Sequence, residues 1–283
     1  MGCSTSIIGS VLIWGTSACG GTGDGTVGPP PAAVDASEQP SVVPTAFRMS
    51  DLDLREPHIF LGLAGCADVT DTPFLGVSIN GALQKAIQTD ANGDGLLDFN
   101  ALVVFRPVDT SRSTVASELR FADCTSPMTS TSCTAAPSAQ VLSSTASNVS
   151  IDTCLGPLSG TTFAPYSPEI PAPTGPCFVS ELMTLELNLG GLPIRLRDVN
   201  LAAEYTGTPT DRLTSGLIRG FLNESDANAM LPSPINAPLS SLLPGGTGSC
   251  ATHDDRDVNS GITGWYFYLE FSAAQVPYVD HAE

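Results

Sequence analysis

Residues 90–98 bring carboxylate and amide side chains together at a regular spacing, D-x-N-x-D-G-x-x-D. Calcium is held in proteins by about six to eight oxygen ligands, and side chains at the first, third and fifth positions of such a loop converge on one point. Gly95 stands at the sixth position, where the backbone must turn sharply. The spacing therefore predicts a calcium ion in this loop. The predicted ligands are the side chains of Asp90, Asn92, Asp94 and Asp98 and the carbonyl oxygen of Leu96.

These nine residues resemble the loop of EF-hands and, more closely, that of dockerins and other extracellular calcium modules. The resemblance covers the loop and the helix that enters it. It ends at the twelfth position, where EF-hands place Glu and dockerins place Asp, because this chain has Ala101. The last ligand must then be water or come from another segment, such as Asp68, Asp71 or Asp109. The alternative is a solvated Asn/Asp/Gly turn that holds no ion.

The elements on either side of the loop set its role. Ile79, Leu83 and Ile87 form a stripe at helical spacing, which predicts a helix over residues 79–89. Residues 99–105, FNALVVF, indicate a buried strand rather than a second helix. A calcium sensor needs a second helix that swings open, so we expect a structural ion. Because the loop lacks the bidentate carboxylate that EF-hands have at the twelfth position, calcium should bind with a dissociation constant of about 10⁻⁴–10⁻³ M.

Most other segments with a clear pattern are predicted strands. Apolar residues alternate with polar ones over residues 183–189, 194–205 and 265–271. The alternation slips by one residue at Asp198, which is typical of a β-bulge. With one or two short helices, these strands predict a mainly β fold. We expect a β-sandwich or jelly-roll-like domain over residues 47–283.

Three other stretches have weaker patterns. Residues 213–222 fit neither a helix nor a strand well, because two glycines interrupt them. Ser225 is a candidate N-cap for a short helix that follows it. Residues 125–150 and 156–176 are rich in Ser, Thr, Pro or Gly, which predicts long irregular loops.

The cysteines predict disulfides that pin these loops. Cys3 and Cys19 lie near the N-terminus, and six cysteines remain, an even number that permits three disulfides in an oxidising compartment. The six are Cys66, Cys124, Cys133, Cys154, Cys177 and Cys250. Their spacing allows about 15 pairings, and Cys124 with Cys133 is the most natural single pair.

The first 46 residues are predicted to direct export of the protein and to attach it to a membrane. Residues 1–18 contain a short apolar stretch of the length of a signal-peptide core, and residues 16–19, TSAC, resemble a bacterial lipobox. The resemblance implies that Cys19 is lipidated and anchors the protein to a membrane. The alternative is an ordinary secretory signal cleaved near Ala18, which would make the protein secreted. Residues 19–46 are rich in Gly, Pro and Ala, which predicts a disordered tether.

Charge and motif content exclude some functions. The chain has 29 acidic and 11 basic residues, a net charge of −18, so its field repels nucleic acids. His58 and His281 are isolated, and neither a G-x-S-x-G nor an H-E-x-x-H motif is present, so we predict no catalytic residue. Residues 253–257, HDDRD, are expected to form an acidic surface loop, with a second cation site as the alternative.

Two classes of function therefore stay open. The loop, followed by VVFRP at residues 103–107, is similar to bacterial cell-surface lipoproteins, a likeness that implies a location and no activity. We expect a calcium-stabilised protein of the outer membrane or cell surface with a non-enzymatic role in adhesion, glycan binding or scaffolding. Its expected partners are the membrane, through the lipid, and a glycan or surface protein. The alternative is a secreted hydrolase with a structural calcium ion.

Overall fold

The computed structural model of the chain describes residues 43–62, 65–74, 76, 78–136, 139–189, 192–232 and 237–280. The predicted signal peptide, the predicted lipidation site Cys19 and most of the predicted tether lie outside the described residues. The first strand begins at Thr45, two residues before the predicted start of the domain.

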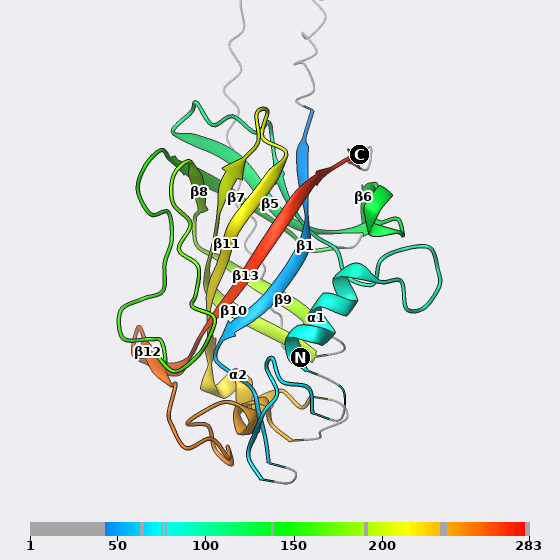
Figure 1. The fold of residues 1–283 in the computed structure, drawn as a ribbon. Coiled ribbons are helices and arrows are strands. Elements are labelled where there is room, and N and C mark those ends of the chain that lie inside the picture. The colour runs from blue at the N-terminus through cyan, green and yellow to red at the C-terminus, as the bar shows by residue number, and fades with distance from the viewer. Residues whose placement is uncertain are drawn as a thin grey trace, which may run out of the picture. The chain divides into compact units, whose positions relative to one another are not determined.

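Eight antiparallel strands close into a barrel (Figure 1). They are β1 (Thr45–Glu56), β4 (Ala101–Phe105), β5 (Thr114–Cys124), β7 (Val141–Val149), β8 (Cys177–Ser180), β10 (Leu192–Thr206), β11 (Arg212–Asn223) and β13 (Ile262–Val276). The order around the ring is β1-β13-β11-β10-β8-β7-β5-β4, and β4 pairs again with β1. The prediction of a mainly β fold is confirmed, but a sandwich or jelly roll is wrong. Because β5 pairs with both β4 and β7, the sheet has no gap at which two layers could separate.

The remaining elements lie outside this ring. They are the strands β2 (Phe60–Leu61), β3 (Ala67–Asp68), β6 (Cys133–Ala135), β9 (Met183–Leu189), β12 (Asp257–Asn259) and β14 (Tyr278–Val279), the helices α1 (Ile79–Gln88) and α2 (Glu224–Ala229), and the 3₁₀ turns η1 (Met128–Ser130) and η2 (Leu239–Leu242). Within the described residues, no helix is long and apolar enough to cross a membrane.

Large aromatic side chains fill the middle of the barrel. Phe105 on β4 contacts Phe47 on β1, Phe178 on β8 and Tyr205 on β10, with ring centroids 5.0–6.0 Å apart. β4 and β8 are not neighbours in the ring, so the contact between Phe105 and Phe178 crosses the interior. All four rings are buried. The interior of the barrel is therefore a packed core.

Several local predictions are confirmed. The predicted helix is α1, which Ser78 caps by accepting a hydrogen bond from the Gly81 amide. The predicted bulge lies in β10, where the pairing with β11 shifts and Asp198 has a φ of 51°. Residues 213–222, for which the sequence favoured neither a helix nor a strand, belong to the strand β11.

Two local predictions are wrong. The cap of α2 is Asn223 rather than Ser225, because the Asn223 side chain accepts a hydrogen bond of 2.6 Å from the Asp226 amide. The segment 125–150 is not irregular throughout, since β7 occupies its second half and pairs on both edges, with β5 and β8. That pairing needs backbone groups only, so the Ser- and Thr-rich composition does not prevent it.

All six cysteines of the folded part form disulfides. The pairs are Cys66–Cys250, Cys124–Cys133 and Cys154–Cys177. The expectation of three disulfides and the single proposed pair are both confirmed. The second pair joins the neighbouring strands β5 and β6, and the third closes the base of the long segment between β7 and β8.

Candidate functional site

The predicted calcium loop begins directly after α1 and is wrapped around the carboxylate of Asp90. Oδ1 of Asp90 accepts hydrogen bonds from the amides of Gly93 (2.7 Å) and Asp94 (3.1 Å), and Oδ2 accepts one from Gly95 (2.8 Å). Gly93 and Gly95 have φ values of 75° and 87°, a backbone conformation that favours glycine. The sharp turn predicted at Gly95 is therefore present.

The other predicted side-chain ligands belong to the same hydrogen-bonded loop. Oδ1 of Asn92 accepts from the Asp94 amide at 2.9 Å, and Oδ1 of Asp94 accepts from the Leu96 amide at 2.8 Å. The carboxylate of Asp98 accepts from the Ala91 amide, with both oxygens 3.2 Å away. In the described part of the chain, no three His, Cys, Asp or Glu side chains are grouped so as to hold a metal ion. The loop oxygens instead bind loop amides.

A cavity of about 290 Å³ lies beside this loop. Its lining is formed by Asn92, Asp94, Leu96, Leu97, Asp98, Phe99, Asn100, Phe121, Ala122, Asp123 and Ala136. Asp123, on β5, is the one carboxylate of this lining that comes from outside the loop. The sequence did not single it out, because only the pairing of β4 with β5 brings it near. It is the structure's best candidate for the ligand missing at Ala101.

The three carboxylates suggested from the sequence for that role are engaged elsewhere. Asp68 is bonded to His58, Asp71 accepts a hydrogen bond from Asn80, and Asp109 accepts two from Ser111. None of the three lines the cavity beside the loop.

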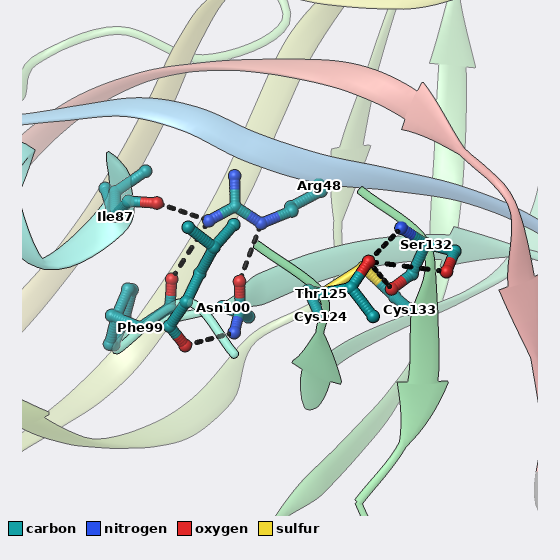
Figure 2. Close-up of a disulfide and its surroundings, with 9 residues drawn as sticks. Arg48, Ile87, Phe99, Asn100, Cys124, Thr125, Ser132 and Cys133 are labelled. Atoms are coloured by element: carbon teal, nitrogen blue, oxygen red, sulfur yellow. Dashed lines mark hydrogen bonds between the residues drawn. A yellow bond between two sulfur atoms is a disulfide. The ribbon is translucent and has the colours of Figure 1, made fainter. Parts of the chain in front are cut away.

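The second half of the loop is tied to the end of β5. The Leu97 amide donates to the carbonyl of Cys124 at 2.9 Å, and the Ser126 amide donates to the carbonyl of Gly95 at 2.8 Å. These bonds lie next to the Cys124–Cys133 disulfide, which Figure 2 shows beside Thr125 and Ser132. The loop is thus held by a covalently closed hairpin.

The buried Arg48 on β1 holds both ends of the loop (Figure 2). Its Nε donates to Oδ1 of Asn100 at 2.7 Å, its Nη2 donates to the carbonyl of Ile87 near the end of α1, and Nη2 also lies 3.3 Å from the carbonyl of Phe99. Burial lowers the pKa of Arg48 to about 10. A guanidinium satisfied by carbonyl and amide oxygens fixes the helix against the strand that follows the loop.

A second group of polar side chains gathers where three loops meet beyond the end of β1. Nδ1 of His58 lies 2.5 Å from Oδ2 of Asp68, and the ring of His58 stacks on Tyr166 with centroids 3.6 Å apart. The Tyr166 hydroxyl donates to Oδ2 of Asp255 at 2.8 Å and lies 2.6 Å from Nε2 of His253. These residues come from widely separated parts of the chain, so their spacing in the sequence gives no signal.

Glu56 completes this group, and its carboxylate is buried. Both of its oxygens accept a hydrogen bond from the Phe163 amide, at 3.2 and 3.1 Å. Burial, and to a smaller extent the charge of Asp255, raise the pKa of Glu56 to about 7. We call the group the junction cluster. It consists of Glu56, His58, Asp68, Tyr166, His253 and Asp255.

The other carboxylates of the junction cluster respond to their own surroundings. Burial raises the pKa of Asp255. Burial also acts on Asp68, but hydrogen bonds from His58 and Thr70 outweigh it and hold the pKa of Asp68 below its ordinary value. Residues 253–257 alternate between half-buried and exposed, and the side chain of Asp255 is 8% exposed.

The junction cluster joins loops rather than presenting a nucleophile. The imidazoles of His58 and His253 hydrogen-bond to carboxylates or to Tyr166, and the ring of Phe163 stacks on His253 with centroids 4.1 Å apart. Burial and the bond to Asp255 raise the pKa of Tyr166, so its hydroxyl remains a donor. The Cys66–Cys250 disulfide links two of the three loops covalently. This chemistry suits a structural connection.

Comparisons of the chain with protein-family models, curated proteins and solved structures gave no match.

Proposed function

We propose that this protein is a calcium-stabilised cell-surface lipoprotein with a non-enzymatic binding role. The observation that carries the proposal is the loop at residues 90–98, where four oxygen-bearing side chains lie within nine residues. Three of them, Asn92, Asp94 and Asp98, line the same cavity as Asp123. A hard cation prefers such oxygen ligands. Its charge would offset the repulsion among Asp94, Asp98 and Asp123.

The surroundings of the loop favour a structural ion. Arg48 and the Cys124–Cys133 hairpin hold α1, the loop and β4 together, so an ion could bind without movement of the helix. Calcium would add ligand bonds to a loop that is already folded, so binding should raise stability with little change in shape. The three disulfides favour an oxidising compartment, which agrees with the proposed export.

The cavity beside the loop supports a binding role. Asparagine and aspartate side chains lie on its loop side, and Phe99 and Phe121, whose ring centroids are 5.7 Å apart, lie in its lining. Polar groups next to aromatic rings suit a sugar hydroxyl and a sugar face. We therefore favour a glycan as the partner over a protein.

The test is a calcium titration of the purified protein by calorimetry and by thermal unfolding. Wild type should bind one calcium ion with a dissociation constant of about 10⁻⁴–10⁻³ M. At a calcium concentration about thirty times that constant, the free energy of unfolding should rise by about 2 kcal/mol. Asp94→Asn and Asp123→Asn keep the size of the side chain and remove one charge, so each should weaken binding about tenfold.

The matched control is Asp109→Asn. Asp109 accepts hydrogen bonds within an exposed loop turn, as the predicted ligands do, but it does not line the cavity. Its variant should bind calcium as wild type does. If millimolar calcium leaves the melting temperature unchanged, the proposed ion site is refuted. If the protein binds a glycan on an array equally well with and without calcium, glycan binding does not depend on the ion.

A further inference from the structure

The segment between β7 and β8 runs along the outside of the barrel (Figure 1). Its two ends are closed on each other by the Cys154–Cys177 disulfide and by a hydrogen bond of 2.8 Å from the Cys154 amide to the Pro173 carbonyl. Between these ends, Leu155 and Ile170 pack on barrel side chains that include Leu217. We call residues 155–172 the strap.

The strap covers an apolar patch on the outer face of the barrel. Leu217 on β11 and Tyr268 on β13 are each 0% exposed beneath it. The Tyr268 hydroxyl accepts a hydrogen bond of 3.0 Å from the Leu158 amide and contacts the hydroxyl of Thr161. If the strap lifts, an apolar surface with a tyrosine hydroxyl becomes accessible.

The far part of the strap is held by the junction cluster. The Phe163 amide donates to the buried carboxylate of Glu56, and the Tyr166 hydroxyl donates to Asp255. The Tyr166 ring also stacks on His58, and its hydroxyl contacts His253. The hydrogen bonds that attach residues 163–166 to the rest of the protein are therefore made to side chains that can ionise.

We propose that the strap is a pH-dependent cover, attached through residues 163–166 in acid and released as the pH rises towards neutrality, with Glu56 as the proton-sensing group. The attached state keeps Glu56 buried beside other acids, whereas release exposes it to water. Ionisation of Glu56 therefore favours release.

Burial and the charges of Asp255 and Asp257 disfavour the ionised form of Glu56. The Phe163 amide and the charge of His58 favour that form, but they are outweighed, because the pKa of Glu56 is raised overall. Around Tyr166 the acids are Asp68, Asp255 and Glu56.

The pH range follows from the two states of Glu56. Its pKa is about 7 when the strap is attached and returns towards the ordinary value of 4.5 on release. The released state then binds fewer protons between these values, so the opening constant should rise by up to about tenfold per pH unit from about pH 5 to 6.5 and level off above 7.

The test is hydrogen exchange followed by mass spectrometry on the intact, disulfide-bonded protein from pH 5 to 8. Rates for peptides that cover residues 158–168 are corrected for intrinsic exchange at each pH. Wild type should show corrected exchange that rises with pH and then levels off. Glu56→Gln keeps an acceptor for the Phe163 amide but cannot ionise, so its corrected exchange should rise much less steeply with pH than that of wild type.

Glu204→Gln is the matched control. Glu204 accepts a hydrogen bond of 2.9 Å from the Thr174 amide near the base of the same segment, outside the junction cluster. Its variant should keep the wild-type pH profile, whereas Tyr166→Phe should raise exchange at every pH. The proposal is overturned if the corrected exchange of wild type does not depend on pH, and this outcome needs no variant. It is also overturned if a folded Glu56→Gln variant keeps the wild-type dependence of exchange on pH.

Discussion

Removing the Cys66–Cys250 disulfide should cost more free energy of unfolding than removing Cys124–Cys133. The first pair is separated by 184 residues and the second by 9. A cross-link restricts the unfolded chain by an amount that grows with the logarithm of the loop length, which gives about 5 kcal/mol for the first pair and about 2.5 kcal/mol for the second.

The deeper burial of Cys124 and Cys133 reduces this difference in unfolding free energy. Cys124 and Cys133 are 0% and 1% exposed, whereas Cys66 is exposed and Cys250 half-buried. Replacing the buried pair by alanine leaves a cavity in addition to the lost cross-link, which we place at about 1 kcal/mol. The net expectation is that the Cys66→Ala/Cys250→Ala variant is less stable than the Cys124→Ala/Cys133→Ala variant by about 1.5 kcal/mol.

The assay is urea unfolding of both double variants and of wild type at one pH. The slope of unfolding free energy against urea should rise in both variants, because the unfolded chain exposes more surface once a cross-link is gone. The increase should be larger for the pair that closes 184 residues. Equal stability losses, or equal slopes, would refute the reasoning from chain entropy.

Three further outcomes follow from single contacts. Gly216→Ala places a methyl group 2.6 Å from the ring of Phe271, so it should lower the unfolding free energy by about 1–3 kcal/mol in urea. Asn223→Ala removes the cap of α2 and should cost about 1 kcal/mol, more than Ser225→Ala, as thermal unfolding would show. As the pH rises from 4.5 to 7, wild type should lose up to about 3 kcal/mol of unfolding free energy that Glu56→Gln retains, because the folded state binds the Glu56 proton more tightly than the unfolded state does. Urea unfolding at several pH values measures this loss.

Local features of the sequence predicted what local physics decides. The predicted calcium loop, its turn at Gly95 and the bulge at Asp198 each depend on neighbouring residues, and the turn and the bulge have the expected backbone. The closure of the sheet is different. Alternation of apolar and polar residues looks the same in a sandwich and in a barrel, and only the pairing of β5 with both β4 and β7 decides between them.

The residues that escaped sequence reasoning are those whose role arises from long-range contacts. Gly216 looked unfavourable in any element, yet it gives the ring of Phe271 the space it occupies across the β11–β13 pair. Asp123 became a candidate ligand only through strand pairing, and Glu56 acquires a raised pKa from loops that follow it by more than 100 residues. A sequence pattern reports neighbours along the chain, and these effects depend on neighbours in space.

The fixed surroundings of the calcium loop determine how an ion there could act. Arg48 binds the carbonyl of Ile87 at the end of α1 and the side chain of Asn100 after the loop, so the loop's two flanks cannot separate without exposing a buried guanidinium. The Leu97 amide is bonded to Cys124, inside the disulfide-closed hairpin. An ion bound between such flanks has no second arrangement to select, and a ligand shifts an equilibrium only between states that differ. Calcium should therefore stabilise the barrel and shape the adjoining cavity, rather than switch it between two forms.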